Sequence, residues 1–161
     1  MYGQTKLEGD QAITASGCEH LIFRTSWVYS ARGSNFMKTM LRLASDRSEL
    51  NIVADQIGAP TPARLIANIT ALALDSNMPG GLYHLAPAGE TSWHGFASEI
   101  FRLAGKNTSA TPIPTSDYPT PAQRPLNSRM DTTKLETALN IQMPDWQSQL
   151  VLTLGEYLEE K

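Results

Sequence analysis

The stretch YGQTKLEGD, residues 2–10, opens a helix that we expect to run towards Thr14, and the apolar segment Leu21-Ile22-Phe23 follows it. Residues four apart project from the same face of a helix, so the phenol of Tyr2 and the ammonium of Lys6 can point into one pocket. A nearby positive charge lowers the pKa of a phenol from its reference value of about 10. The pair is therefore a candidate proton donor, although a Tyr and a Lys at this spacing also lie on many solvated helix faces.

Four segments resemble one known family in the same order. Residues 2–10 followed by LIFRTSWVY (21–29) resemble the helix and next strand of the extended short-chain dehydrogenases/reductases, and within them the dTDP-4-dehydrorhamnose reductase family. DQIGAPT (55–61), GLYHL (81–85) and RPLNSR (124–129) resemble the same family. The resemblance covers nearly the whole chain, but only the C-terminal half of the family.

The resemblance implies catalytic roles for the first helix. Tyr2 would protonate the ketone oxygen of a 4-keto nucleotide sugar while hydride arrives from the nicotinamide of NADPH or NADH. Lys6 would lower the phenol pKa and hydrogen-bond the nicotinamide ribose, so both residues would also contact the cofactor. The expected substrate partner is a nucleotide sugar.

Five further residues are candidate substrate ligands. Trp27 matches a family position that shapes the sugar and nucleotide pocket, where an indole can stack on the apolar face of a pyranose. Arg24, in an apolar strand, requires either a phosphate or a structural salt bridge. Asn35, Gln56 and Arg124 could donate hydrogen bonds to the diphosphate and hydroxyls. Alternatively, Gln56 fixes its turn and Arg124 braces a proline-rich loop.

Composition limits the partners and the compartment. With 161 residues and 41% hydrophobic content, the chain could bury one ordinary core. Its net charge of −3, without a run of five like charges, gives no electrostatic support for binding nucleic acid or an anionic membrane. No apolar run approaches the length of a membrane span. Cys18 is the only cysteine, so we expect a cytoplasmic protein without disulfides.

No metal site is expected. His20, His84 and His94 lack ligand spacing. Some members of the resembled family hold Mg²⁺ with carboxylates at a dimer interface, but Arg64 stands where one carboxylate would be needed. The sequence thus argues against Mg²⁺, while a homodimer remains an expected assembly because an exposed strand edge favours self-association.

Hydrophobic periodicity and turn residues predict an α/β fold, in which Phe36 and Trp93 each belong to a helix whose apolar residues recur at helical spacing, as on a core face. Residues 112–125 hold five of the ten prolines and are expected to form an extended loop. The other expected elements are a strand over 20–29, a helix over 35–45 capped by Ser34, a strand over 50–54, a helix that is capped by Thr61 and starts at Pro62, a strand over 82–86, a helix from residue 93 capped by Thr91 or Ser92, and two final helices capped by Asp131 and Asp145.

The resemblance divides this fold into two parts. Residues 1–30 would be the last helix and strand of a Rossmann-like dinucleotide-binding sheet. Residues 31–161 would form a small mixed α/β substrate-binding domain, some segments of which return to the Rossmann-like part.

A glycine-rich phosphate loop is absent from the sequence. No Gly-x-Gly-x-x-Gly or Gly-x-x-Gly-x-x-Gly follows a strand, and the eleven glycines are scattered. The resemblance places the cofactor-binding half before Met1, so we expect a C-terminal portion that is inactive alone. Two alternatives stay open: another nucleotide-sugar epimerase or dehydratase of the same superfamily, and a non-catalytic subunit such as the regulatory subunit of methionine adenosyltransferase, which resembles these reductases.

Overall fold

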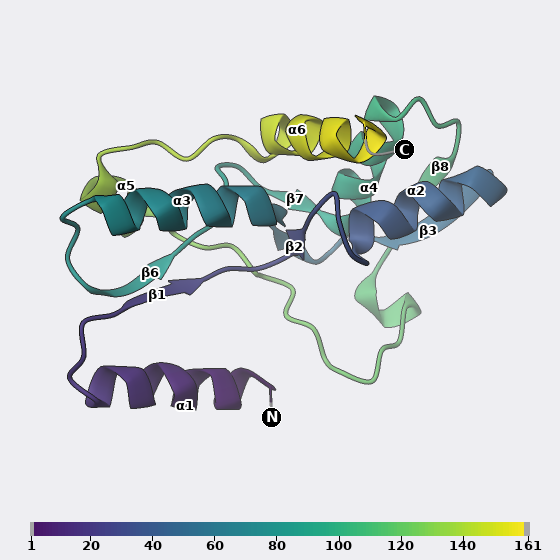
Figure 1. Ribbon diagram of the computed structural model, residues 1–161. Helices are drawn as coiled ribbons and strands as arrows, with labels where there is room; N and C mark the ends of the chain where they lie inside the picture. Colours follow the sequence, from purple (N-terminus) through teal and green to yellow (C-terminus); the bar gives the residue numbers. More distant parts are fainter. Residues whose placement is uncertain (1, 160–161) are drawn as a thin grey trace.

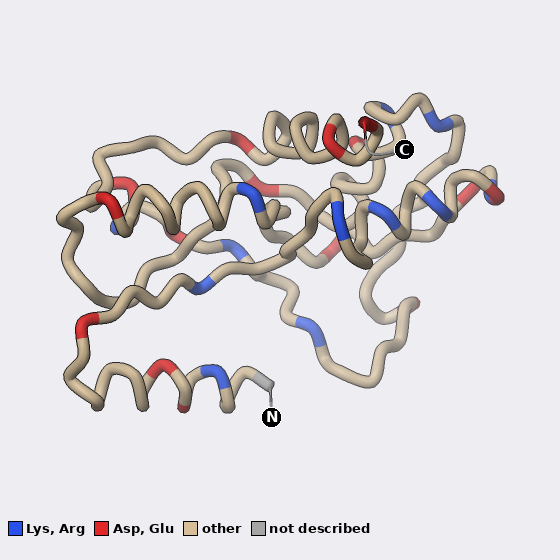
Figure 2. Tube along the Cα trace, in the orientation of Figure 1, with Lys and Arg blue, Asp and Glu red and all other residues tan. Residues whose placement is uncertain are grey.

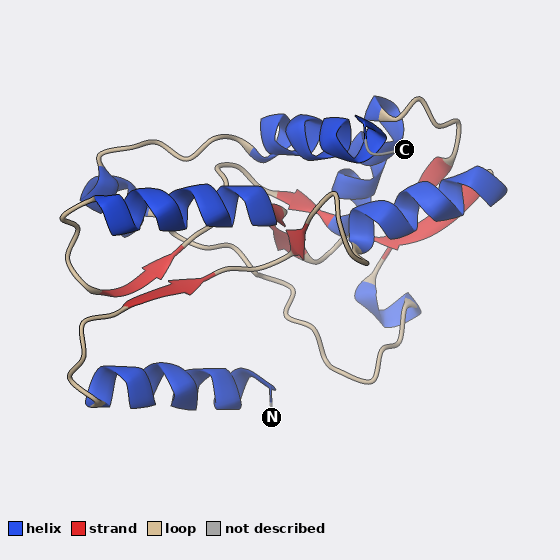
Figure 3. Ribbon diagram, viewed as in Figure 1, coloured by secondary structure: helices blue, strands red, loops and turns tan. Residues whose placement is uncertain are grey.

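The computed structural model describes residues 2–159, with the side chain of Tyr2 outside the described part. Helices and short strands alternate along the chain (Figures 1 and 3). They are α1 Tyr2–Ala15, β1 Leu21–Arg24, β2 Val28–Tyr29, α2 Phe36–Asp46, β3 Glu49–Val53, β4 Ile57–Gly58, β5 Thr61–Pro62, α3 Ala63–Asp75, β6 Gly81–His84, β7 Thr91–Ser92, α4 Trp93–Leu103, β8 Ser109–Ile113, the 3₁₀ turn η1 Thr115–Asp117, α5 Thr133–Leu139 and α6 Trp146–Glu159.

The strands pair two by two, and most of the pairs are parallel. β1 runs parallel to β6, β2 to β5 and β3 to β8, whereas β4 and β7 are antiparallel. Parallel neighbours need long crossover connections, which here contain helices. The predicted α/β class is therefore confirmed.

One hydrophobic cluster lies on the β1–β6 pair. Leu65 and Ile69 of α3, Leu135 of α5 and Tyr83 of β6 are buried together in it. Figure 1 shows α3 and α5 on one side of this strand pair and α1 on the other. This cluster packs α3 and α5 against β1 and β6, and none of its residues lines the candidate site.

A second, larger cluster joins α2, α4 and α6 to β3. Met37 of α2, Phe96 and Ile100 of α4, and Leu150 of α6 are each 0% exposed. Their spacing along each helix gives the apolar face that the sequence predicted. Because α2 and α4 are fixed by this core, their N-terminal ends hold their first aromatic residues in place.

The predicted strand over residues 20–29 is wrong in one respect, because it is two strands. Trp27 has φ 52°, in the left-handed region that only a small share of non-glycine residues adopt. Such a residue cannot continue a pleated strand, so β1 ends at Arg24 and β2 begins at Val28. Trp27 therefore lies at a bend between the two strands.

The predicted cap of α2 is also wrong. The helix begins at Phe36, and its N-cap is Asn35, whose Oδ1 accepts a hydrogen bond from Lys38 N at 3.2 Å. Ser34 lies one residue too early to reach that donor. Asn35 also donates from Nδ2 to Ser30 O at 2.7 Å, which ties the preceding loop to the helix.

Other boundaries also differ from the sequence prediction: β3 and β6 each begin one residue earlier, and the N-cap of α5 is Thr132 rather than Asp131. Thr61 lies in β5 and donates to Ala59 O at 3.1 Å, so it does not cap α3, whose N-cap position is Pro62. The proline-rich loop begins later than predicted, because Pro112 belongs to β8. Its missing N–H is tolerated because, among the strands that the structure describes, β8 pairs only with β3.

Charges are interspersed over the trace (Figure 2). Helices α1 to α5 each carry both a basic and an acidic residue, which agrees with the small net charge. Within residues 2–159, none of the helices has the length and apolar character needed to cross a bilayer.

The first prediction concerns the cap of α2. Replacing Asn35 with Ala removes the acceptor for Lys38 N and should lower the free energy of unfolding by about 1 kcal/mol. Ser34→Ala is the matched control, since Ser34 does not cap the helix. Urea unfolding measures both, and equal losses in the two variants would contradict the assignment of Asn35.

The second prediction concerns pH. Asp145 Oδ1 accepts from Ser148 N at 2.8 Å, and this bond holds the carboxyl pKa below its usual value. Because the folded pKa is lowered, its contribution to stability exists above the unfolded pKa of about 3.9 and disappears as pH falls through the folded value.

Asp145→Asn keeps an oxygen acceptor that does not titrate. Between neutral pH and about pH 2, the parent chain should therefore lose more stability than the Asn variant. Urea midpoints at several pH values measure the difference. Identical pH dependence in the two chains would show that the cap carboxylate is not responsible.

Candidate functional site

A cleft of about 1050 Å³ opens between α2, β3, the start of α4 and the segment after β8. Three of the predicted substrate ligands line it: Trp27, Gln56 and Arg124. Residues far apart in the sequence thus meet at one site. A volume of this size suits a ligand with several chemical groups, such as a nucleotide sugar.

Two tryptophans stack against each other in the cleft wall. The rings of Trp27 and Trp93 have centroids 3.8 Å apart and an interplanar angle of 15°. Phe36 lies against Trp93 with a centroid distance of 4.7 Å. A Cβ at Gly58 would come within 3.0 Å of Trp27 Cε2, so glycine gives the indole room to approach the backbone.

Gln56 fixes the edge of this stack. Its Oε1 accepts a hydrogen bond from Trp93 Nε1 at 3.1 Å, and its Nε2 donates to Thr115 Oγ1 at 3.1 Å. Thr115 in turn donates from Oγ1 to Asp55 Oδ1 at 2.5 Å and from its backbone N to the same carboxylate at 3.0 Å. These bonds from Thr115 hold the pKa of the Asp55 carboxyl below its usual range.

Arg124 supplies a positive charge at the exposed side of the cleft. Among the described residues it makes no hydrogen bond and no ion pair. Glu49 also lines the cleft, but its Oε1 accepts from Thr111 Oγ1 at 2.6 Å. Arg47 also lines the cleft, so Arg124 is one of two arginines there that can meet an anionic ligand.

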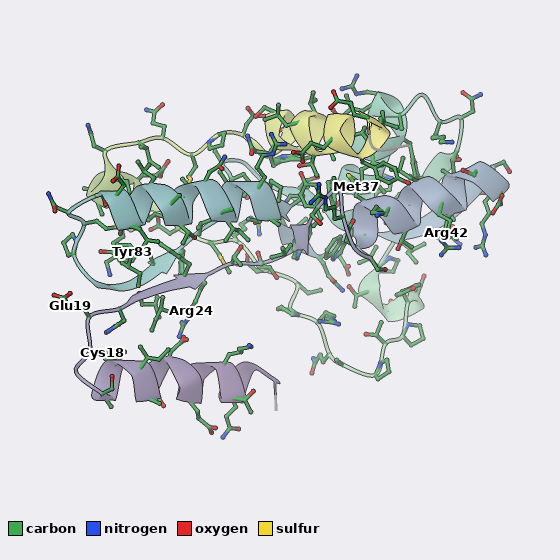
Figure 4. The ribbon with its side chains drawn as sticks, in the orientation of Figure 1. Cys18, Glu19, Arg24, Met37, Arg42 and Tyr83 are labelled. Carbon is green, nitrogen blue, oxygen red and sulfur yellow. The ribbon has the colours of Figure 1, made fainter. Side chains whose placement is uncertain are left out.

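Arg24 and Asn35 do not line the cleft. Nε and Nη2 of Arg24 donate to Asp10 Oδ2 at 2.9 and 2.7 Å, which joins β1 to α1. Figure 4 shows the Arg24 side chain between these two elements. For Arg24 the structure contains the salt-bridge alternative, and for Asn35 the polar groups serve as the cap of α2.

The proposed proton donor lies on α1, outside the cleft. Lys6 is exposed on this helix, and Tyr2 begins it, with its side chain outside the described residues. The relation of the phenol to the ammonium thus stays a prediction from their spacing. Tyr29 is no substitute donor, because burial in the core raises the pKa of its phenol.

Trp93 and Phe36 were missed as site residues. Their apolar spacing predicted core positions, and both do pack against the large cluster, but each also lines the cleft. One signal could have found them. Each is the first residue of its helix, directly after a capping Ser92 or Asn35, and such a position faces the loops as well as the core.

No cluster of three or more His, Cys, Asp or Glu within residues 2–159 is arranged to hold a metal ion. Arg64, at the position where the resembled family would need a carboxylate, forms an ion pair with Glu156 that connects α3 to α6.

Comparisons with known proteins agree with this architecture. A reductase of Shigella flexneri named dTDP-4-dehydrorhamnose reductase is 48% identical over 97% of this chain and 56% of its own length. The crystal structure of such a reductase from Clostridium acetobutylicum superposes with a TM-score of 0.92 at 36% identity, covering 98% of this chain and 55% of that one. A Bacillus anthracis reductase solved in complex with NADP gives 0.88 at 35% identity, covering 96% and 54%.

This chain spans about half the length of the relatives that it matches. The RmlD substrate binding domain, a family defined by its sequence pattern, matches residues 1–159. A match of that extent, together with the superposition of the fold, establishes that the chain belongs to the RmlD substrate binding domain family.

Proposed function

We propose that this chain is the substrate-binding half of a reductase that converts dTDP-4-dehydro-L-rhamnose to dTDP-L-rhamnose with NADPH or NADH. One observation carries the proposal: in this chain, which belongs to the family, an indole wall, an amide and an exposed arginine surround one ligand-sized cleft. The relatives' names identify the ligand class. The cytoplasmic location and the homodimer expected from the sequence remain predictions.

Each side of the cleft suits a different part of a nucleotide sugar. The indole of Trp27 offers apolar contact to the sugar ring. The exposed Arg124 offers a charge-assisted bond to the diphosphate. Gln56 uses both ends of its amide within the protein, so its contribution to binding is through its neighbours.

We further propose that Tyr2 and Lys6 carry the chemistry. The dinucleotide would supply a hydride to the keto carbon. Tyr2 would give its phenolic proton to the sugar oxygen, and Lys6 would keep the phenol pKa low enough for that transfer.

This chain fits only the nicotinamide ribose end of a dinucleotide. Lys6 is exposed on α1, and an ammonium has three donors for ribose hydroxyls. The glycines are scattered and form no phosphate-binding turn.

The division of the chain is also part of the proposal. Residues 1–30 would complete a dinucleotide-binding sheet, and residues 31–161 would bind the substrate. The parallel pairing of β1 with β6 supports the expectation that a later segment returns to the first part.

The third prediction tests ligand binding. The 161-residue chain should bind dTDP-rhamnose, and Trp27→Ala should weaken this affinity by about five- to tenfold, the value of one aromatic contact. Isothermal titration calorimetry gives both constants. Trp146→Phe is the matched control, because Trp146 is buried against Phe96 in the core and does not line the cleft.

Two outcomes would count against the proposal. A folded parent chain that does not bind dTDP-rhamnose would overturn the substrate assignment. Equal weakening by Trp27→Ala and Trp146→Phe would remove the sugar contact from Trp27.

The fourth prediction tests the chemistry in an enzyme completed with the cofactor-binding half of a relative. Tyr2→Phe should lower kcat by about two to four orders of magnitude, the usual contribution of a general acid, with little change in sugar-nucleotide binding. Lys6→Met should lower kcat and weaken the cofactor together.

The pH profile separates the two roles of Lys6. If Lys6 lowers the phenol pKa, the residual activity of Lys6→Met should depend on a group that titrates at higher pH than in the parent. Full activity in Tyr2→Phe would exclude the mechanism. Binding of the sugar nucleotide without turnover in the completed enzyme would favour a non-catalytic subunit.

A further inference from the structure

Gln56 lies at the junction between the cleft wall and the segment after β8. Its side chain is buried, with 9% of the residue exposed, and both ends of its amide are bonded to other side chains. Trp93 Nε1 donates to one end, and the other end donates to Thr115 Oγ1. A buried amide with both ends bonded acts as a spacer of fixed length between its partners.

On the first side, Gln56 restricts the plane of Trp93. An indole has a single N–H donor, so a hydrogen bond at that edge fixes its rotation about the side-chain bonds. Phe36 lies against the same ring at 4.7 Å. Trp93 is thereby held as a rigid surface.

Trp27 takes its orientation from that surface. The two rings lie nearly parallel, with centroids 3.8 Å apart. The left-handed backbone of Trp27 and the close approach of Gly58 leave the indole little room to turn elsewhere. A rotation of the Trp93 ring would therefore change the orientation of the stacked Trp27 ring.

On the second side, Gln56 holds the start of the segment that completes the cleft. Thr115 is the first residue of η1, and Asp117, Tyr118 and Arg124 line the cleft after it. The hydroxyl and the backbone N–H of Thr115 both donate hydrogen bonds to the carboxylate of Asp55, which anchors the start of this segment. The same amide thus sets the distance between this segment and the indole pair.

We propose that Gln56 and Trp93 are positioning residues for sugar recognition, which hold the Trp27 indole at a fixed distance from the segment that carries Arg124. The inference rests on the proposed function and names the specificity of the same cleft. Replacing either residue should reduce the affinity contributed by the sugar rather than that contributed by the nucleotide, because Trp27 is the surface proposed to contact the sugar ring.

A residue that acts only on overall stability would behave differently. Its loss would weaken dTDP and dTDP-rhamnose alike by lowering the folded fraction. The decisive quantity is therefore the ratio of the two dissociation constants, that of dTDP divided by that of dTDP-rhamnose.

The test compares Gln56→Met and Trp93→Phe with the parent 161-residue chain. Met keeps the length of Gln but has neither amide group, and Phe keeps a ring but lacks the N–H. Calorimetry with dTDP and with dTDP-rhamnose should show the ratio reduced by about three- to fivefold in both variants, less than the loss expected for Trp27→Ala, with dTDP affinity changed by less than about twofold. Trp146→Phe should keep the parent ratio, since Trp146 lies in the core.

A second measurement needs no ligand. Two stacked indoles couple their electronic transitions, so circular dichroism of the parent should contain an exciton signal from Trp27 and Trp93. Gln56→Met removes no indole, yet it should weaken this signal if the amide sets the plane of Trp93. Thermal melts confirm that each variant is folded under the conditions used.

Each outcome has a distinct meaning. A parent ratio near one would overturn the proposed function and this inference with it. A parent ratio well above one that both variants keep, or a parallel loss of both affinities, would overturn the positioning role alone. An unchanged exciton signal in folded Gln56→Met would overturn it as well.

Discussion

The stacking of Trp27 on Trp93 is the interaction on which the arrangement of the cleft depends. It joins the segment between β1 and β2 to the first residue of α4. The contact needs an uncommon backbone at Trp27 and a glycine behind it at position 58. A conformation of this kind costs of order 1–3 kcal/mol and persists only where its surroundings hold it, as the large core beneath α2 and α4 does here.

The fold was largely predictable from the sequence. The apolar stripes of α2, α4 and α6 and the turn residues around them indicated the helices, and the buried faces follow that pattern. The cap of α2 was placed one residue early, because Ser34 and Asn35 are both good capping residues and only the distance to Lys38 N distinguishes them.

The site was predictable in part. Trp27, Gln56 and Arg124 could be named from segments that resemble a family, and they line one cleft. The partnership of Trp27 with Trp93 could not be read from the sequence, since the two residues are 66 positions apart (93 − 27) and nothing local signals a left-handed Trp. The apolar period around Trp93 indicated only a core helix, because a period does not distinguish a buried first turn from one that borders a cleft.

The exposure of α1 has a consequence for the timescale on which its residues are ordered. An isolated helix of 14 residues is marginal in water, and Gly3 and Gly9 weaken this one further. The ion pair from Arg24 to Asp10 is partly exposed and adds little that salt would not screen. The backbone amides of α1 should therefore exchange with deuterium well before those of α3 or α4, as a separate cooperative unit of low local stability. The backbone positions of residues 2 and 6 would keep the spacing of about one helical turn only while that unit stays folded.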